Sequence, residues 1–380
     1  MDIRDLRKDI NDIDKQLIEL FKRRMETSCN IAEYKSRNNL PILDENRENE
    51  VLERVADMAG EPFSGYAKVL YSTLFDLSRS YQTRIVYSDS KLSKDIEKSI
   101  ISTPEKFPRK ARVACQGVEG AYSQIACNKL FENAEINFVS TFDDVFNEVE
   151  KGNCRYGILP IENSSAGSVI SVYNLMEKHR FSIVKSVKLK IDHCLLVPFG
   201  VKFEDIKEIV SHEQAIGQCN DFLEQNKSIN VTVFSNTAAA AKYVAESRRK
   251  DIAAISSKNC AEIYNLKILE QKVQNNENNC TRFICISKDM EIYPDSKKIS
   301  LMMTIPHSPG SLYHIMSKFA ALDLNLTKLE SRPISGKNFE FLFYFDFDAS
   351  VFSKEVKSLL NELDAVLEYF VFLGNYNEID

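Results

Sequence analysis

Hydrophobic residues recur with different periods in different parts of the chain. At the N-terminal side, apolar residues lie three or four positions apart: Leu6, Ile10, Ile13, Leu17, Leu20 and Phe21. This spacing predicts a long amphipathic helix, which Pro41 interrupts. Asp44 is a suitable N-cap for a second helix, which Gly60 and Pro62 close. A third helix is expected over residues 64–84.

The three expected helices have unequal lengths, and two short helices cannot cover the apolar stripe of the first. Residues 1–84 are therefore predicted to form an all-α domain that pairs with a second copy as an intertwined helical dimer. The next stretch, 85–110, is rich in Ser and Lys and contains Pro104 and Pro108. We expect a linker there, with a short helix around residues 94–101.

Beyond the linker, short apolar runs alternate with helical stretches as far as residue 287. The runs are 112–114, 136–139, 156–161, 194–197, 231–234, 252–255 and 283–286. This alternation predicts an α/β domain over 111–287 with a largely parallel sheet.

Residues 298–380 follow a different order. Strands are expected at 299–305, 326–329, from Phe339 to residue 347, and at 369–373, with helices at 312–322 and 354–363. That βαββαβ order predicts an α+β, ferredoxin-like domain. The fold class is therefore a multidomain chain with one all-α part and two mixed parts.

Composition narrows the functional classes. The net charge of −6 argues against nucleic-acid binding. Nine scattered cysteines without C-x-x-C spacing indicate free thiols in a reducing cytoplasm. The charged N-terminus is not a signal peptide, and no apolar run approaches the roughly 18 residues of a membrane helix. We expect a cytoplasmic protein without membrane or nucleic-acid partners, and no metal-ligand spacing stands out.

Cationic residues of the helical part form a possible binding site. Arg24 and Lys35 are eleven residues apart, which places them about 20° apart on one helix face. Arg7 lies roughly 80–100° from both, so it could serve the site of a partner subunit. The second and third helices add further polar groups: Asp44, Arg47, Glu48, Ser78 and Gln82. Together these residues offer cations for carboxylates, and a carboxyl and amides for hydroxyl and ether groups.

The stretch LRKDI…DKQL…FKRR…IAEYK…ILDENRENEVL…S-x-x-x-Q resembles the all-helical chorismate mutase family over most of residues 1–84. The resemblance implies a set of substrate-binding residues: Arg7, Arg24, Lys35, Asp44, Arg47, Glu48, Ser78 and Gln82. Lys35 and Glu48 would also take part in catalysis. Rearrangement of chorismate is pericyclic and needs no nucleophile or metal. It needs a dianion held in its compact conformer, with positive charge near the breaking ether bond.

In the α/β part, several apolar strands end in small, polar or hydroxyl-bearing residues. These strand ends are 116–123, 162–168, 211–215, 235–237 and 256–257. Each would place N–H donors at a helix N-terminus, where anions bind. Neither GxGxxG nor a P-loop is present, which disfavours nucleotide binding. His212 is either a proton donor or a hydrogen-bonded turn residue.

The segments GVEGAYS, ILPIENSSAGSV, DHCLL, SHEQAIGQC and CTRF resemble prephenate dehydratase across nearly all of 111–287. The resemblance implies two α/β lobes of the periplasmic-binding-protein type with a site in their cleft. Its catalytic residues would be Glu162, Asn163, Ser211, Gln218 and Thr281, with Ser164 and Arg282 binding substrate. Thr281 would assist the departing hydroxyl of prephenate, whereas Arg282 would hold a carboxylate or brace the loop. The amide-rich run before Thr281 is predicted to be only a loop.

One position departs from the dehydratase pattern. Glu213 follows the Ser-His pair where the family usually has proline. This change loosens the turn that places Ser211 and His212, and it adds a negative charge.

The segments SPGSLYHIM and NLTKLESRP of the last part resemble the ACT regulatory domain of prephenate dehydratases. The resemblance implies that phenylalanine binds, at an interface between subunits, to a defined set of residues: Gly310, Ser311, Leu312, Asn325, Leu326, Glu330 and Ser331. Ser311 stands where the family usually has alanine. Bound phenylalanine would stabilise a closed, less active state.

The sequence thus predicts a cofactor-free, bifunctional chorismate mutase–prephenate dehydratase that phenylalanine inhibits and that assembles as a homodimer or larger homo-oligomer. One alternative is a dehydratase that acts on arogenate. The attached mutase argues against this alternative, because it produces prephenate. The other is a non-catalytic amino-acid sensor, which would have no need of Thr281, Asn163 or the mutase cations.

Overall fold

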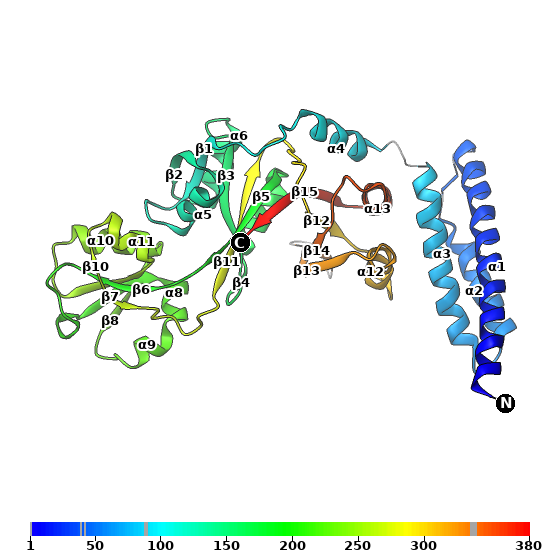
Figure 1. Ribbon diagram of the computed structural model, residues 1–380, viewed down its shortest axis with the longest axis horizontal. Coiled ribbons are helices and arrows are strands. Elements are labelled where there is room, and N and C mark those ends of the chain that lie inside the picture. Colours follow the sequence, from blue (N-terminus) through cyan, green and yellow to red (C-terminus); the bar gives the residue numbers. More distant parts are fainter. Residues whose placement is uncertain (1, 39, 42, 87–89, 335–339) are drawn as a thin grey trace. The chain divides into compact units, whose positions relative to one another are not determined.

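The computed structural model describes the chain except for residues 1, 39, 42, 87–89 and 335–339 (Figure 1). The chain divides into two compact units, each built from two separate stretches. Unit 1 contains Met1–Lys98 and Ile299–Phe372, and unit 2 contains Ser99–Lys298 and Leu373–Asp380. This division differs from the predicted domain boundaries, because the last eight residues group with the middle of the chain. No helix in the described part is both long enough and apolar enough to cross a membrane.

The N-terminal helices of unit 1 confirm the predicted pattern. They are α1 (Ile3–Arg37), α2 (Glu45–Ala59) and α3 (Ser64–Val86). The Asp44 side chain accepts a hydrogen bond from the N–H of Arg47 and so caps α2. Gly60 ends this helix at φ 62°, a backbone conformation that favours glycine. A further helix, α4 (Lys91–Ser102), occupies the predicted linker.

The apolar stripe of α1 remains exposed. Its members include Ile3, Leu6, Ile10, Ile13, Leu17 and Leu20. Isolated exposed apolar residues are ordinary, but a continuous stripe along a helix is typical of a contact surface.

The remainder of unit 1 has the predicted βαββαβ order. Its elements are β12 (Lys298–Thr304), α12 (Ser311–Ala321), β13 (Asn325–Pro333), β14 (Phe341–Asp348), α13 (Lys354–Val366) and β15 (Phe370–Ile379). The strand order β13-β14-β12-β15 is that of a ferredoxin-like unit. Phe319 of α12 packs on Phe345 and Phe347 of β14, which fixes this helix on the sheet. Phe339, the predicted start of β14, lies outside the described residues.

Unit 2 has two lobes. In the first, the strand order is β5-β11-β3-β1-β2, from β1 (Lys110–Gln116), β2 (Asn133–Val139), β3 (Tyr156–Asn163), β5 (Ser182–Lys190) and β11 (Cys280–Ser287). The short strand β4 (Gly167–Ser168) pairs with β3. The helices of this lobe are α5 (Tyr122–Leu130), α6 (Phe142–Glu150) and α7 (Ile170–His179).

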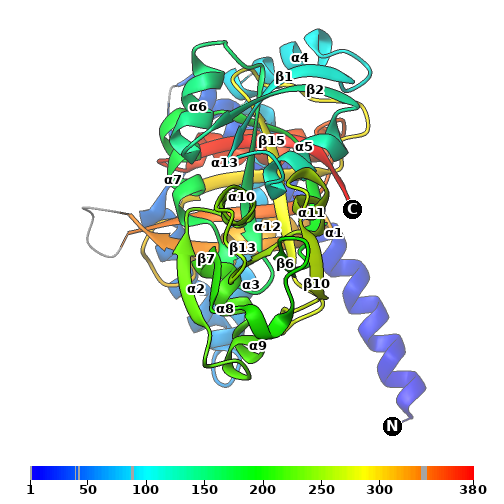
Figure 2. The ribbon, with the colours of Figure 1, turned by 90° about the vertical axis from the view of Figure 1, so that its left-hand side faces the viewer.

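The second lobe has its own sheet, with the order β10-β6-β9-β7-β8. Its strands are β6 (Cys194–Val197), β7 (Glu208–His212), β8 (Asn230–Phe234), β9 (Ile252–Ser256) and β10 (Lys267–Gln271). Its helices are α8 (Glu213–Gln218), α9 (Asn220–Glu224), α10 (Thr237–Glu246) and α11 (Lys258–Ile263). In Figure 2 this lobe faces the viewer.

The chain crosses between the lobes twice, between β5 and β6 and again between β10 and β11. The crossings explain where the predicted largely parallel sheet is wrong. On its return, β11 runs antiparallel to both β3 and β5, and β6 runs antiparallel to β9 and β10. The βαβ parts keep parallel pairing, as in β1 with β2 and β7 with β8.

The last strand extends further than predicted. β15 was expected to end at Leu373, but it continues to Ile379. Its final residues pair in parallel with β5, and Asn377 lies opposite Lys185. This part of β15 therefore forms an edge of the first lobe of unit 2.

Candidate active sites

The pairing of β3 with β11 brings the predicted dehydratase residues together. Asn163 lies opposite Thr281, and Glu162 lies opposite Arg282. These residues are more than one hundred positions apart in the sequence, yet the register of two antiparallel strands makes them direct neighbours. Asn163 and Thr281 are both buried, at 6% and 8% exposure.

The Thr281 hydroxyl is part of a hydrogen-bond network formed mainly by amide side chains. Asn163 Nδ2 donates to Thr281 Oγ1 over 2.9 Å and to Asn279 Oδ1 over 2.8 Å. Gln218 Nε2 donates to Asn163 Oδ1 over 3.5 Å, and His193 Nε2 lies 3.0 Å from Gln218 Oε1. The His193 ring must donate here, because an amide oxygen can only accept. Burial lowers the pKa of His193, which favours this neutral ring.

A cavity of about 310 Å³ connects these groups to the second lobe. Its wall includes Asn163, Thr281 and Tyr122 from the first lobe, and His212 and Gln218 from the second. The His212 Nδ1 accepts from the N–H of Gln214, so a neutral His212 carries its proton on Nε2. Burial lowers the pKa of His212 and so favours the neutral form. Both roles predicted for His212 are compatible with this position.

Ser211 does not join this site. It has 0% exposure, and its hydroxyl donates to the main-chain carbonyl of Ile255 on β9 over 2.7 Å. It lies outside the wall of the cavity as the described residues form it. The structure therefore does not support direct contact between Ser211 and a substrate. Ser211 points into the sheet of the second lobe, whereas the next residue in the strand, His212, faces the cavity.

Ser164 and Arg282 flank the pair of Asn163 and Thr281. Ser164 Oγ accepts from the N–H of Cys280 over 2.9 Å, which ties the end of β3 to the start of β11. The guanidinium of Arg282 lies 3.1 Å from the Glu162 carboxylate and 3.7 Å from that of Glu378. Arg282 is thus held between two acidic groups, one on β3 and one on β15.

Glu378, on the last strand, is the centre of this charged cluster. Lys188 and Lys298 lie 2.9 and 3.2 Å from its carboxylate. Burial alone would raise the pKa of Glu378, but the hydrogen bond from Lys188 and the charges of Lys298 and Arg282 together hold its pKa below the usual value. The carboxylate therefore stays ionised at neutral pH and balances three cations.

Three of the predicted mutase residues lie on facing parts of α1 and α3. Arg24 donates to the Ser78 hydroxyl over 2.6 Å and to the Leu74 carbonyl over 3.3 Å. Burial lowers the pKa of Arg24, although a guanidinium remains charged at neutral pH. Gln82, one turn beyond Ser78, is also buried. Arg24 and Ser78 thus form a polar contact between α1 and α3, and Gln82 lies one helical turn beyond it.

The other predicted mutase residues are more exposed to solvent. Lys35 and Glu48 are partly buried, and Glu48 forms an ion pair with Arg79, a cation that the sequence analysis did not select. Arg47 is exposed and pairs with Glu50 over 2.9 Å. Arg7 is exposed on the first half of α1 and lies outside this group.

The predicted effector residues lie at two ends of the βαββαβ module. Gly310, at φ 83°, precedes the first residues of α12, Ser311 and Leu312. Asn325 and Leu326 begin β13, while Glu330 and Ser331 lie near its end. The Glu330 carboxylate contacts Arg332 over 2.5 Å and Lys328 over 3.1 Å.

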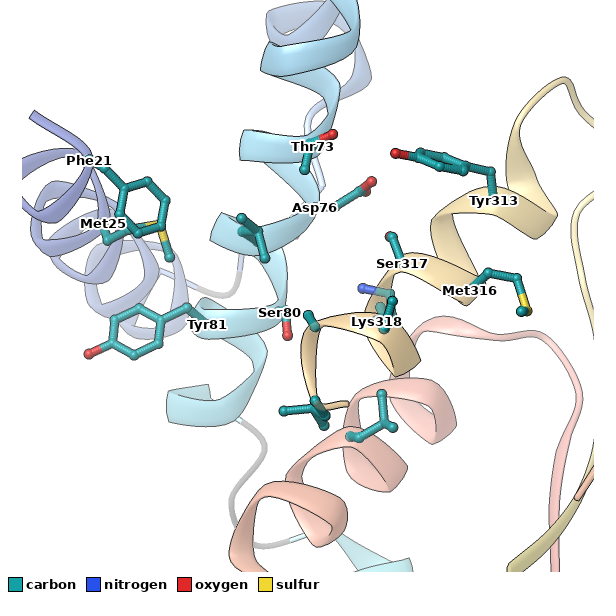
Figure 3. Close-up of a pocket in the computed structure, with 15 residues that line it drawn as sticks. Phe21, Met25, Thr73, Asp76, Ser80, Tyr81, Tyr313, Met316, Ser317 and Lys318 are labelled. Carbon is teal, nitrogen blue, oxygen red and sulfur yellow. The ribbon is translucent and has the colours of Figure 1, made fainter. Parts of the chain in front are cut away.

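The helices α3 and α12 also contact each other within unit 1. Asp76 of α3 pairs with His314 of α12, and Ser80 donates to Glu362 of α13 over 2.6 Å. Beside these contacts is a cavity of about 670 Å³. Asp76 and Thr73 project from α3 toward the α12 side of this cavity, where Tyr313 and Ser317 lie (Figure 3).

Comparison with known proteins agrees with this arrangement. Residues 6–83 match the family model of chorismate mutase type II, and residues 113–291 match that of prephenate dehydratase. The bifunctional chorismate mutase/prephenate dehydratase of Escherichia coli strain K12 is 30% identical over 378 residues, which cover 98% of this chain and 95% of that protein. The chain belongs to the bifunctional chorismate mutase/prephenate dehydratase family.

Two other similar proteins are informative. Arogenate dehydratase 2 of Petunia hybrida is 38% identical over 281 residues, or 70% of this chain and 71% of that protein. A crystal structure of prephenate dehydratase from Arthrobacter aurescens, in complex with L-Phe, has a TM-score of 0.63 at 24% identity. The match covers 70% of this chain and 90% of that one. At this identity it supports the shared fold.

A bifunctional chorismate mutase/prephenate dehydratase rearranges chorismate to prephenate, and then removes water and carbon dioxide to form phenylpyruvate. In this chain, the mutase match falls on α1–α3 and the dehydratase match on the two lobes of unit 2. The two activities therefore belong to different compact units of one polypeptide.

Two residues that the sequence analysis did not select, His193 and Asn279, form hydrogen bonds with predicted dehydratase residues. His193 is in the DHCLL segment, directly before the buried strand β6. Asn279 precedes Thr281 by two positions, so in extended backbone both side chains face the same side. That spacing was an available signal. The amide-rich run itself is a loop in the structure, as predicted, and β11 begins directly after Asn279.

Replacing Glu378 by glutamine is expected to destabilise the dehydratase unit by about 3 kcal/mol, because three cations would lose a partly buried counter-ion. Urea unfolding of the full chain, followed through loss of dehydratase activity, measures this effect. Asp380→Asn is the matched control, since Asp380 is 92% exposed and lies 3.9 Å from Lys188. Equal unfolding midpoints for Glu378→Gln and Asp380→Asn would contradict the stabilising role of Glu378.

Proposed function

We propose that Thr281 assists the departure of the prephenate hydroxyl in the dehydratase reaction. The supporting observation is the direction of one hydrogen bond. Thr281 Oγ1 accepts from Asn163 Nδ2, so the hydroxyl proton of Thr281 can point toward another acceptor. The departing hydroxyl of prephenate is such an acceptor.

In this proposal, the threonine hydroxyl donates a hydrogen bond while the carbon–oxygen bond breaks. Loss of carbon dioxide supplies the electron pair that makes the ring aromatic. The hydroxyl leaves as water with a proton taken from solvent, so one proton is consumed for each carbon dioxide released. Threonine is a weak acid, but aromatisation provides most of the driving force, so a positioned donor is sufficient. Asn163 and Gln218 hold Thr281 in place, and the Glu162–Arg282 pair braces the strand ends.

For the mutase reaction, we propose that Arg24, Lys35 and Arg47 bind the chorismate dianion, with Ser78 and Gln82 beside Arg24. Asp44 and Glu48 would complete the site around the N-terminus of α2. Arg7 would reach the site of a partner subunit, as in an intertwined homodimer. The exposed apolar stripe of α1 supports such pairing, because a second copy could cover it.

A direct experiment tests the combined activity. The purified full-length chain is given chorismate alone, and prephenate and phenylpyruvate are followed over time. We expect prephenate to appear first and phenylpyruvate to follow without added cofactor or metal. Failure to form either product would refute the bifunctional assignment. Conversion of arogenate but not prephenate would favour the alternative dehydratase, and binding of amino acids without turnover would favour a sensor.

We propose that the βαββαβ module is an ACT domain and that phenylalanine binds to it at the residues around Gly310 and on β13. Support comes from the L-Phe complex of the Arthrobacter aurescens protein, which shares the fold. Phenylalanine is the amino acid made from phenylpyruvate, so this binding would provide feedback inhibition. We also expect the enzyme in the cytoplasm, on the basis of its sequence composition.

The contacts of α12 suggest how this effector could reach the mutase site. α12 starts at the proposed phenylalanine site, and its His314 pairs with Asp76 of α3. α3 also carries Ser78, which accepts from Arg24. A shift of α12 on phenylalanine binding would therefore move the helix that shapes the mutase site.

Ser331→Ala and Glu330→Gln are expected to weaken phenylalanine inhibition at least about tenfold, because the first removes a hydroxyl and the second removes a negative charge from the proposed effector site. The measurement is the phenylalanine concentration that halves dehydratase activity. Glu368→Gln is the control, since Glu368 is an exposed acidic residue of the same module. Unchanged inhibition in both site variants would reject the location of the effector site.

A further inference from the structure

The main chain fixes the orientation of the Asn163 amide. Its Oδ1 atom accepts from the N–H groups of Ser165 and Ala166, over 3.0 and 2.8 Å. A main-chain N–H can only donate, so the atom that faces both groups must be the amide oxygen. The Asn163 NH2 group then faces Asn279 and Thr281, and each of its two hydrogens has one acceptor.

This orientation determines that of Asn279. Because Asn163 donates, the Asn279 atom 2.8 Å away must be its oxygen. The Asn279 NH2 group consequently points elsewhere. Asn279 has 1% exposure, and its Nδ2 has no hydrogen-bond partner among the described residues. A buried donor without an acceptor is unfavourable, so this NH2 group is available to an acceptor atom of a ligand.

Asn279 lines a cavity of about 540 Å³ next to the cavity of Thr281, and Gln214 and Gln218 belong to the walls of both. The wall around Asn279 consists largely of hydroxyl and amide side chains, including Ser164 and Gln274. Among the described residues that form it, none is charged. Such a wall suits neutral oxygen acceptors and offers no carboxylate to an ammonium group.

We propose that Asn279 is a specificity-determining residue of the dehydratase site, whose NH2 group donates to the keto oxygen of the prephenate side chain. This inference rests on the proposed role of the Thr281 cleft. Prephenate carries a keto group where arogenate carries an ammonium group. A keto oxygen accepts a hydrogen bond from Asn279, whereas an ammonium group only donates and would face another donor.

Selection between prephenate and arogenate is relevant to this chain, because similar proteins include arogenate dehydratases. The inference gives this chain a physical basis for selecting the keto acid. It also gives the amide-rich run a function, since this run places Asn279 and lines its cavity with Gln274, Asn275 and Asn276.

The test compares kcat/KM for prephenate and for arogenate, measured separately on the full-length chain. Asn279→Asp keeps an oxygen that accepts from Asn163 but replaces the free donor by a carboxylate oxygen. We expect the ratio of kcat/KM for prephenate to that for arogenate to fall about 10- to 100-fold. Asn278→Asp is the matched control, because it adds the same charge at an exposed neighbouring position and should leave the ratio unchanged.

An unchanged ratio in Asn279→Asp, with equal losses for both substrates, would overturn the proposal and leave Asn279 as a support for Asn163. If Asn279→Asp does not fold, Asn279→Ser provides the same comparison, with a higher KM for prephenate as the expected result. The Thr281→Ala variant separates the two levels of inference. Full dehydratase activity in that variant would refute the proposed site itself, whereas its inactivity together with an unchanged Asn279→Asp ratio would refute only the specificity role.

Discussion

Replacing Thr281 by alanine is expected to lower kcat of the dehydratase reaction by about 100- to 10,000-fold, the usual range for a lost proton donor in a transition state. The hydroxyl accepts from Asn163 and is thereby oriented to donate to substrate. The methyl group of alanine keeps neither function. Because α1–α3 belong to the other unit, conversion of chorismate to prephenate should continue at its normal rate.

The measurement follows both products from chorismate, so that prephenate accumulates in Thr281→Ala while phenylpyruvate does not form. Thr281→Ser is the informative control, because it retains the hydroxyl and should preserve most of kcat. Loss of both activities in Thr281→Ala would instead indicate misfolding. A fully active Thr281→Ala enzyme would exclude the role that we propose for this residue.

Arg24→Ala should have the opposite effect. We expect kcat/KM for chorismate to fall about 100- to 1,000-fold, because a preorganised cation that binds a dianion in a water-poor site is difficult to replace. Arg24 is held by Ser78 and the Leu74 carbonyl, so it is already positioned before substrate arrives. Dehydratase activity on supplied prephenate should remain unchanged.

Arg23→Ala is the matched control for this experiment. Arg23 is the preceding residue of α1 and is exposed, so it has the same charge on a different face of the helix. Its replacement should change mutase kcat/KM less than about threefold, as expected for a surface substitution. Similar losses in Arg23→Ala and Arg24→Ala would mean that general charge, rather than a positioned guanidinium, is responsible.

Local signals predicted the helices well. The N-cap at Asp44, the glycine at position 60 and the spacing of apolar residues on α1 are properties of neighbouring residues, and the structure reproduces them. Strands were harder to find. β5 reads SIVKSVKLK, and its lysines interrupt the apolar run. One of them, Lys188, pairs with Glu378 of the last strand.

For the candidate dehydratase site, the sequence predicted only those residues that the family resemblance supplied. The resemblance gave Asn163 and Thr281, which the structure makes neighbours. It also gave Ser211, whose hydroxyl is used inside the second lobe. The importance of Asn279 depends on the direction of a hydrogen bond, which is set by the main chain of residues 165 and 166. No sequence pattern contains that information.

The end of β15 also has a consequence for protein synthesis. A ribosome completes residues 110–298 before it makes the strand that pairs with β5, because residues 299–372 come between them. During that interval β5 presents an open edge, which other chains can pair with. A gene fragment that encodes only residues 99–298 should therefore give aggregation-prone protein, and one that appends residues 373–380 through a short linker should restore the missing edge.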